Sequence, residues 1–183
     1  MSRDITGKNV AFVLTDGYED SELTAPWHAV QAAGGTPVLV APSAGLVSGK
    51  KGHSQAVDQA VADSVADQFD ALVIPGGVVN ADHLRMDDDA VEFARGFFEQ
   101  GKPVAAICHG AWLLVEADVV SGRRMTSYPS LRTDLTNAGA TWVDEEVVVD
   151  SGLVTSRTPD DLPAFCAKIV EEIAEGEHAR QHA

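Results

Sequence analysis

The stretch PVAAICHGAWLL, residues 103–114, joins an apolar run typical of a buried strand to a helical pattern through Cys108, His109 and Gly110. A strand that enters a helix through so tight a turn projects the turn residue above the sheet, beside the helix N-terminus. The stretch therefore predicts an α/β fold with Cys108 at a strand end. Spacing alone leaves two interpretations of Cys108 open, a reactive thiol and a buried thiol that fills the core.

The same alternation of strand and helix extends along the chain. Apolar strand-like runs are expected at 9–17, 36–43, 70–77, 102–110, 123–128 and within 141–157, and helical patterns at 19–35, 87–101, 111–122, 129–140 and 159–176. Residues 44–68 predict a hairpin or short strands followed by a brief helix. Continuous apolar strands separated by helices indicate right-handed βαβ crossovers, and hence a doubly wound α/β sandwich with a mostly parallel sheet.

Length and charge limit the function classes. The 183 residues suit a single domain spanning 1–183, with a core of about 8–175 and a loose tail at 177–183. The 13 basic and 28 acidic side chains give a formal net charge of −15. Such a surface repels phosphate backbones and anionic lipid headgroups, so we expect neither nucleic acid nor a membrane as partner.

The N-terminal residues carry no small-residue cleavage site, and no apolar run approaches the length of a bilayer span, which predicts a cytoplasmic protein. The two cysteines, Cys108 and Cys166, are too few for a disulfide framework, so reduced thiols are expected. Cys166 lies among apolar residues of a helical pattern with no base nearby, and is interpreted as structural.

Ligands of doubly wound sheets bind beyond the carboxyl ends of the strands. Three strand ends carry suggestive residues: 16–20, the pair Gly76 and Gly77, and 108–110. A helix N-terminus beside the Cys108 sulfur favours the thiolate and can lower its pKa below the free value of about 8.5. The backbone N–H groups of His109 and Gly77 are candidates for a hole that stabilises an oxyanion.

Several motifs in order resemble the DJ-1/PfpI superfamily, in particular its PfpI (protease I, or general stress protein) branch. They are DGYEDSEL, IPGG followed by DHLR, AAICHGAWLL, TSYPSLRTDLTNAGATWVDEEVVVD and TSRTPDDLPAF, which together cover roughly residues 8–173. The resemblance implies a three-layer, flavodoxin-like sheet related to class I glutamine amidotransferases. The His-x-Glu pair that those amidotransferases carry late in the chain is absent here, so the amidotransferase likeness describes fold more than activity.

The resemblance also implies site residues. Cys108 corresponds to the family nucleophile, and His109 to the base of the PfpI branch, where an acid from a second subunit completes a triad. Asp82 is the candidate for that acid, although many relatives carry glutamate, and a helix cap or a solvated acid is the alternative interpretation. Glu19 corresponds to a glutamate that contacts the sulfur and, when protonated, donates to the thiolate. Sequence alone favours helix capping for Glu19.

The remaining histidines, His28, His53, His83, His178 and His182, show no metal-ligand spacing with another His, Cys or acid. No metal and no cofactor are therefore expected. His28 is expected to pack locally, His83 to line a subunit interface, and His178 and His182 to belong to the tail.

Three functions remain open at this point. The first is a stress-response cysteine hydrolase acting through Cys108 on small carbonyl adducts, as a deglycase or glyoxalase, or on peptides. The second is a redox sensor in which Cys108 is oxidised. The third is a protective chaperone. The resemblance implies a homodimer or larger homo-oligomer, with Asp82 acting in trans.

Overall fold

The structure, a computed structural model, describes residues 3–179. A seven-stranded sheet forms its centre, in the order β10-β11-β7-β6-β1-β2-β5, with β10 antiparallel to β11 and every other neighbouring pair parallel. Its strands are β1 (Asn9–Val13), β2 (Thr36–Ala41), β5 (Gln59–Ala60), β6 (Ala71–Ile74), β7 (Val104–Ile107), β10 (Val148–Asp150) and β11 (Leu153–Ser156).

Two smaller strand pairs lie outside this sheet. They are the antiparallel hairpin of β3 (Leu46–Ser48) with β4 (Ser54–Ala56), and the parallel pair of β8 (Arg124–Met125) with β9 (Thr141–Trp142). The helices are α1 (Asp20–Ala32), α2 (Val78–Leu84), α3 (Asp88–Glu99), α4 (Ala111–Glu116), α5 (Arg132–Asn137) and α6 (Leu162–Glu175).

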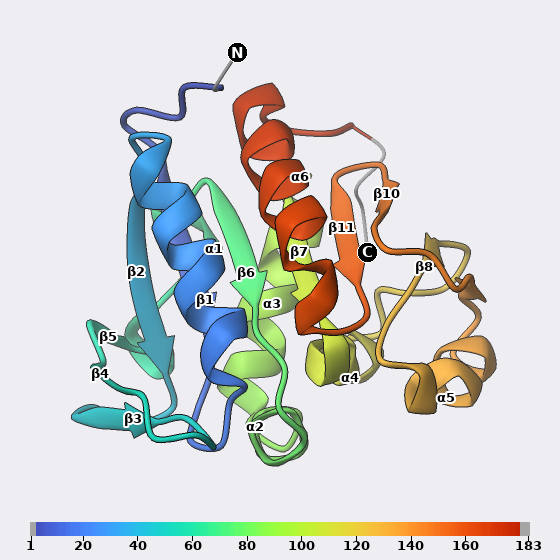
Figure 1. Cartoon of the computed structure of the whole chain (residues 1–183), viewed down its shortest axis with the longest axis horizontal. Helices are drawn as coiled ribbons and strands as arrows, with labels where there is room; N and C mark the ends of the chain where they lie inside the picture. The colour runs from blue at the N-terminus through green and yellow to red at the C-terminus, as the bar shows by residue number, and fades with distance from the viewer. Residues whose placement is uncertain (1–2, 180–183) are drawn as a thin grey trace.

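The sheet separates two helical layers. Helices α1 and α6 lie side by side in front of it, whereas α3 and α4 lie behind it (Figure 1). Each layer has its own apolar core, because β6, β7 and all of β1 except its exposed first residue, Asn9, are buried and send alternate side chains to opposite faces. Phe97 and Phe98 of α3 fill the core behind the sheet, and Phe165 of α6 fills the core in front.

The expected fold class is confirmed: the sheet is mostly parallel and doubly wound. Numbered by position in the chain, the strands β2, β1, β6, β7 and β11 have the order 2-1-3-4-5, which is flavodoxin-like. From β1 the chain adds β2 on one side and β6 on the other, so the topological switch point lies between β1 and β6. Residues after β1, β6 and β7 therefore gather at one edge of the sheet. The hairpin expected within 44–68 is present as β3 and β4.

One helix at this edge was not predicted. Helix α2 directly follows Gly77, and its first two residues, Val78 and Val79, are more than half exposed. Because apolar side chains of α2 face outward, the segment lacks the single apolar stripe by which an amphipathic helix is recognised.

The C-terminal tail also differs from expectation within its described part. The His178 N–H donates to the Gly101 carbonyl, with a nitrogen–oxygen distance of 2.7 Å, so residues 177–179 are held against the loop before β7. Residues 180–183, with His182, lie outside the described residues. Across residues 3–179, none of the helices combines the length and the apolar character that a membrane span requires.

Gly110 allows the turn after β7 to pack against β6. A Cβ atom at this position would lie 2.6 Å from the Ile74 carbonyl oxygen, although the backbone φ of −55° suits any residue. We predict that Gly110→Ala lowers the free energy of unfolding by about 1–3 kcal/mol, measured by urea denaturation, because the backbone of β6 must move. Gly96→Ala is the matched control: Gly96 lies inside α3, where the nearest atom is the Ala66 methyl group at 3.1 Å. In Gly96→Ala the higher helix propensity of alanine should offset the tighter packing, so its free energy of unfolding should change little. Equal losses in the free energy of unfolding for Gly110→Ala and Gly96→Ala would contradict the prediction.

Candidate active site

Cys108 lies in the turn between β7 and α4 with a left-handed backbone, at φ 61°. That conformation is unfavourable for a residue with a Cβ atom and is maintained only where surrounding contacts impose it. Here the Tyr128 N–H donates to the Cys108 carbonyl oxygen at 3.1 Å. The turn leaves Cys108 8% exposed, with its sulfur at the carboxyl edge of the sheet.

His109 is in contact with the thiol. Its Nδ1 lies 3.2 Å from the Cys108 Sγ, and its ring stacks on Tyr128 with a centroid distance of 4.7 Å. Burial, together with the positive charge of Lys50, lowers the pKa of His109 below its usual value. The imidazole is therefore neutral at neutral pH, and its Nδ1 can accept the thiol proton when the ring proton resides on Nε2.

Glu22 is the carboxyl group beside the sulfur. It extends from the first turn of α1, where one oxygen accepts a hydrogen bond of 2.9 Å from the Gly76 N–H, and the group interacts with Cys108, while its other oxygen has no hydrogen-bond partner among the described residues. The side chain is fully buried, and burial raises the pKa of Glu22 to about 8. Glu22 is thus protonated at neutral pH, which allows its hydroxyl to donate to a thiolate.

The contact expected for Glu19 is made by Glu22 instead. Glu19 directly precedes α1, and its carboxylate forms ion pairs with Lys50 and with Lys51, the latter at 2.8 Å. Burial raises the pKa of Glu19, but hydrogen bonds from the two lysines outweigh burial and hold the pKa below its usual range. The expectation of a protonated Glu19 against the sulfur is therefore wrong. Its side chain makes no cap hydrogen bond either.

The backbone N–H groups of His109 and Gly77, which the sequence suggested as donors to an oxyanion, both donate toward the Cys108 sulfur. The pKa of Cys108 nevertheless moves upward, to about 12, because burial and the charge of an ionised Glu22 disfavour the thiolate. This direction is opposite to the expected one, because burial removes the thiol from solvent and so disfavours its charged form. When Glu22 is protonated, its charge disappears and a third donor faces the sulfur.

A cavity of about 270 Å³ opens over these groups. Its lining comes from six separate segments: Glu19, Lys50, Gly77, Val78, Cys108, His109, Tyr128 and Pro159. The volume lies at the lower end of ligand sites. Lys50 extends from the β3–β4 turn, so the cavity has a cation at its mouth in a protein whose net charge is negative.

Asp82 does not reach His109 within one chain. It lies exposed on α2, and among residues 3–179 the His109 ring makes its hydrogen bond only with the Cys108 sulfur. His83 is likewise exposed on α2. The same helix exposes Val78 and Val79, and Tyr128 beside the cavity is 40% exposed.

The other histidines within residues 3–179 do not line this cavity. His53 Nδ1 lies 2.8 Å from the Tyr18 hydroxyl and is part of the hairpin, while His28 lies on α1. His178 differs from expectation: its ring and the carboxylates of Glu172 and Glu175 place three possible metal-ligand atoms within 4.8 Å of one another. The fold creates this group, because Gly176 ends α6 and the chain turns back.

Comparison with known proteins identifies the family of the chain. The DJ-1/PfpI family model matches residues 8–172. The chain belongs to the DJ-1/PfpI family.

Three curated proteins illustrate how similar this chain is to other members. Protein/nucleic acid deglycase 2 of Escherichia coli is 48% identical over 161 residues, which are 86% of this chain and 93% of that protein. General stress protein 18 of Bacillus subtilis is 49% identical over 162 residues, or 87% and 94% of the two chains. Deglycase PfpI of Pyrococcus furiosus is 42% identical over 162 residues, or 88% and 97%.

Solved structures of the family share the fold. The crystal structure of Drosophila melanogaster DJ-1beta superimposes with a TM-score of 0.85 at 30% identity, covering 91% of this chain and 90% of that one. A two-domain protein from Anabaena variabilis with DJ-1/ThiJ/PfpI-like and ferritin-like domains gives a TM-score of 0.88 at 37% identity. That match covers 91% of this chain and 48% of the larger protein.

Glu22 is the site residue that the sequence reasoning missed, although a signal for it exists. The buried positions of α1 are Glu22, Leu23, Pro26 and Val30, a helical stripe that includes one acid. An acid on the apolar face of a helix has no solvent, and it therefore requires a partner inside the protein. Glu19, by contrast, precedes the helix.

The Glu22 carboxyl group is expected to control thiol ionisation. We predict that Glu22→Leu slows iodoacetamide alkylation of Cys108 at about pH 6–7, followed by mass detection, because Glu22 is protonated there and the variant removes its donor to the thiolate. Above about pH 8 the same variant removes a negative charge beside the sulfur, so its alkylation should be faster than that of the unmodified chain. Glu22→Gln keeps an N–H donor and should lie between Glu22→Leu and the unmodified chain. Glu19→Gln is the control for charge at the same edge. An unchanged or faster alkylation of Glu22→Leu at about pH 6–7 would contradict a donating carboxyl group.

Proposed function

We propose that this protein is a cysteine-dependent hydrolase that acts on small carbonyl adducts of amino groups, as a deglycase or glyoxalase-like enzyme. The observation that carries the proposal is the Cys108 Sγ at 3.2 Å from the Nδ1 of a neutral His109, beneath a cavity of about 270 Å³. The deglycase names of several relatives support the substrate class, and the stress-protein name of another supports a role in stress response.

In the proposed reaction, Nδ1 of His109 takes the thiol proton while Sγ of Cys108 forms a bond to the electrophilic carbon. That carbon is the aldehyde carbon that the hemiaminal adduct exposes when its carbon–nitrogen bond breaks, the hydroxyl electron pair forms the carbonyl and the hydroxyl proton leaves with the amine. The carbonyl electron pair then moves to oxygen, and the N–H groups of Gly77 and His109, which face the sulfur, stabilise the resulting oxyanion until it takes the imidazolium proton. Transfer of the proton on this carbon to the adjacent ketone carbon through an enediol gives a thioester, which water hydrolyses to a hydroxy acid and the free thiol.

Cavity size favours small adducts over peptides. A volume of about 270 Å³ suits a few non-hydrogen atoms beside the sulfur, whereas a peptidase needs an extended groove for several residues. A peptidase of the PfpI type remains the alternative within the same chemistry. The reaction needs a reduced thiol, so we place it in a reducing compartment such as the cytoplasm.

We further propose that a homodimer, or a larger assembly of dimers, completes the site. Proton acceptance at Nδ1 requires a proton on Nε2 of His109, and that N–H needs an acceptor. Helix α2 exposes an acid, Asp82, together with Val78 and Val79 beside the cavity. A second copy packed on α2 would cover these apolar side chains and supply Asp82 to His109 in trans.

Redox sensing is the second candidate, because the same groups suit an oxidised sulfur. Transfer of one oxygen from hydrogen peroxide to the thiolate gives sulfenic acid and releases water, and a second transfer gives sulfinic acid. The N–H groups of Gly77 and His109 and the hydroxyl of Glu22 would then hydrogen-bond to the new oxygens.

Steady-state turnover distinguishes the two candidates. We predict that the reduced protein releases amine from methylglyoxal adducts of N-acetyl-lysine, that Cys108→Ala abolishes turnover, and that His109→Gln lowers kcat by about 10²–10⁴-fold because the base is lost. Cys166→Ala is the matched thiol control and should retain full turnover. Turnover no greater than that of Cys108→Ala, with a two-oxygen gain in Cys108 mass at low peroxide, would reject the enzyme and support the sensor.

Mixed dimers test the in-trans acid. We predict that Cys108→Ala and Asp82→Asn are each nearly inactive alone, and that an equal mixture after subunit exchange recovers about a quarter of full activity, since half of the dimers are mixed and one of their two sites is complete. Glu116→Gln with Cys108→Ala is the control mixture. No recovery in the Asp82 mixture, or full activity of Asp82→Asn by itself, would remove Asp82 from the site while leaving Cys108 and His109 unaffected.

A further inference from the structure

A second group of reactive side chains lies at the opposite edge of the sheet from Cys108. Helix α6 contributes Glu172 and Glu175, and the chain after Gly176 turns back so that His178 joins them. Cys108 follows the carboxyl end of β7, whereas His178 is bound to Gly101, just before the amino end of the same strand. The two groups are therefore separated by the length of β7.

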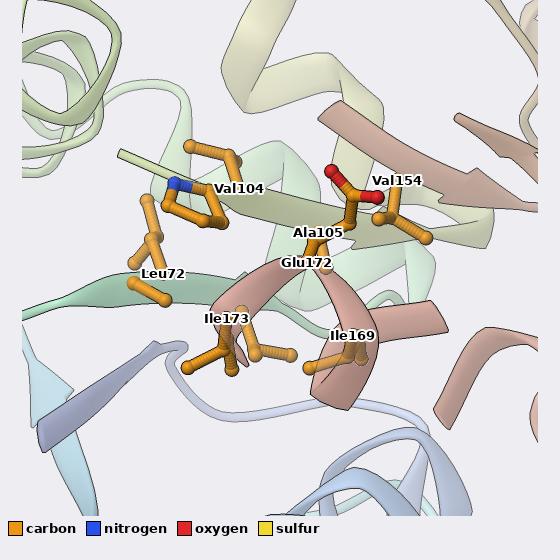
Figure 2. A pocket seen from close by; sticks show the side chains of 10 residues that line it. Leu72, Val104, Ala105, Val154, Ile169, Glu172 and Ile173 are labelled. Carbon is orange, nitrogen blue, oxygen red and sulfur yellow. The ribbon is translucent and has the colours of Figure 1, made fainter. Parts of the chain in front are cut away.

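Glu172 is a buried acid whose charge is not satisfied by hydrogen bonds. It is 5% exposed, and its Oε2 atom has no hydrogen-bond partner among the described residues. Figure 2 shows its carboxylate reaching from α6 to the side of Val154, above the apolar side chains of Leu72, Ile169 and Ile173. These residues line a void of about 10 Å³, which is at the lower limit for one water molecule.

His178 presents a second buried atom to the same point. Its Nε2 lies 3.0 Å from Glu172 Oε2, yet neither atom has hydrogen-bond geometry with any described residue. The ring is fixed on two sides: the His178 N–H donates to Gly101, and a Cβ atom at Gly152 would lie 2.8 Å from the ring carbon Cδ2. Two buried ligand atoms that converge at ion-pair distance without a hydrogen bond to any described residue are the arrangement expected of ligands around a cation.

Glu175 completes a set of three. Its ligand oxygen lies within 4.8 Å of both other atoms, and its carboxylate is exposed on the last turn of α6. Arg3 is its present partner, with Nη1 at 3.1 Å from Oε1. Ligand atoms around one zinc ion are about 3–3.6 Å apart, because each bond is about 2.0–2.2 Å long. A small rotation of the exposed Glu175 side chain would bring the set to that spacing.

We propose that Glu172, Glu175 and His178 bind a divalent first-row transition ion, with water at its remaining position, and that the ion fastens residues 176–179 to α6. Two carboxylates and one imidazole are ligands that zinc, cobalt and manganese accept. Nothing in the proposed reaction at Cys108 requires this ion.

Zinc titration by calorimetry tests the proposal, carried out on the Cys108→Ser variant so that the reactive thiol does not compete. We expect one zinc ion per chain, and a loss of affinity of at least about 10–100-fold in both Glu172→Gln and His178→Gln, because a direct ligand matters at least as much as an outer one. Glu177→Gln is the matched control. It removes the same charge from an exposed neighbour of His178, and should change affinity less than about twofold.

Cobalt absorption and thermal unfolding provide readouts independent of activity. We expect visible cobalt bands that disappear in His178→Gln, and a zinc-dependent rise in Tm that Glu177→Gln keeps and Glu172→Gln loses. His178→Gln alters only the terminal segment, so circular dichroism should show an unchanged fold. Zinc binding that is absent at millimolar concentration, or equally strong in Glu172→Gln, His178→Gln and Glu177→Gln, would show that Glu172 and His178 form only an ion pair.

Discussion

The hydrogen bond from the Gly76 N–H to the Glu22 carboxyl group connects the segments on which the site depends. It ties the end of β6 to the first turn of α1, and the same carboxyl group faces the sulfur at the end of β7. The approach is possible only because residue 76 has no side chain: a Cβ there would lie 2.5 Å from Glu22 Oε1 and 2.8 Å from the Cβ of Cys108. Three segments that are distant in the sequence, α1, β6 and β7, thus meet beside the thiol.

Two glutamates of the same segment have opposite states because their surroundings differ. Glu22 lies on the buried face of α1, so its proton is retained to about pH 8 and it carries no charge at neutral pH. Glu19 lies three residues earlier at the mouth of the cavity, where Lys50 and Lys51 keep it ionised. The result is an uncharged hydrogen-bond donor, Glu22, beside the sulfur, and a carboxylate, Glu19, whose charge is balanced by two lysines. A developing negative charge on sulfur or oxygen therefore meets donors rather than another free carboxylate.

The sequence was sufficient for those features that depend on local patterns. The continuous apolar runs predicted strands buried on both faces, and the sheet is mostly parallel with helices on both sides. The Cys108 turn was found because a strand, a small tight turn and a helical pattern follow one another directly. Helix α2 escaped prediction because Val78 and Val79 face outward, which removes the usual apolar stripe. The upward direction of the Cys108 pKa also could not be predicted, since it depends on burial by distant segments.

The choice between Glu19 and Glu22 shows where local information ends. Glu19 directly precedes α1 and Glu22 lies in its first turn. From the sequence, Glu19 suits a helix cap as well as it suits a role in the site. Their difference arises from the rotation of α1 against β6, and from the β3–β4 turn that brings two lysines to one of them. His178 is a similar case, because its meeting with Glu172 depends on how the chain returns after Gly176. The sequence by itself determined the order of strands and helices and the turn that carries Cys108, because periodicity and turn chemistry are local. Only the tertiary structure decided which acids are buried and which charges they meet, because desolvation and pairing depend on segments far apart in the chain.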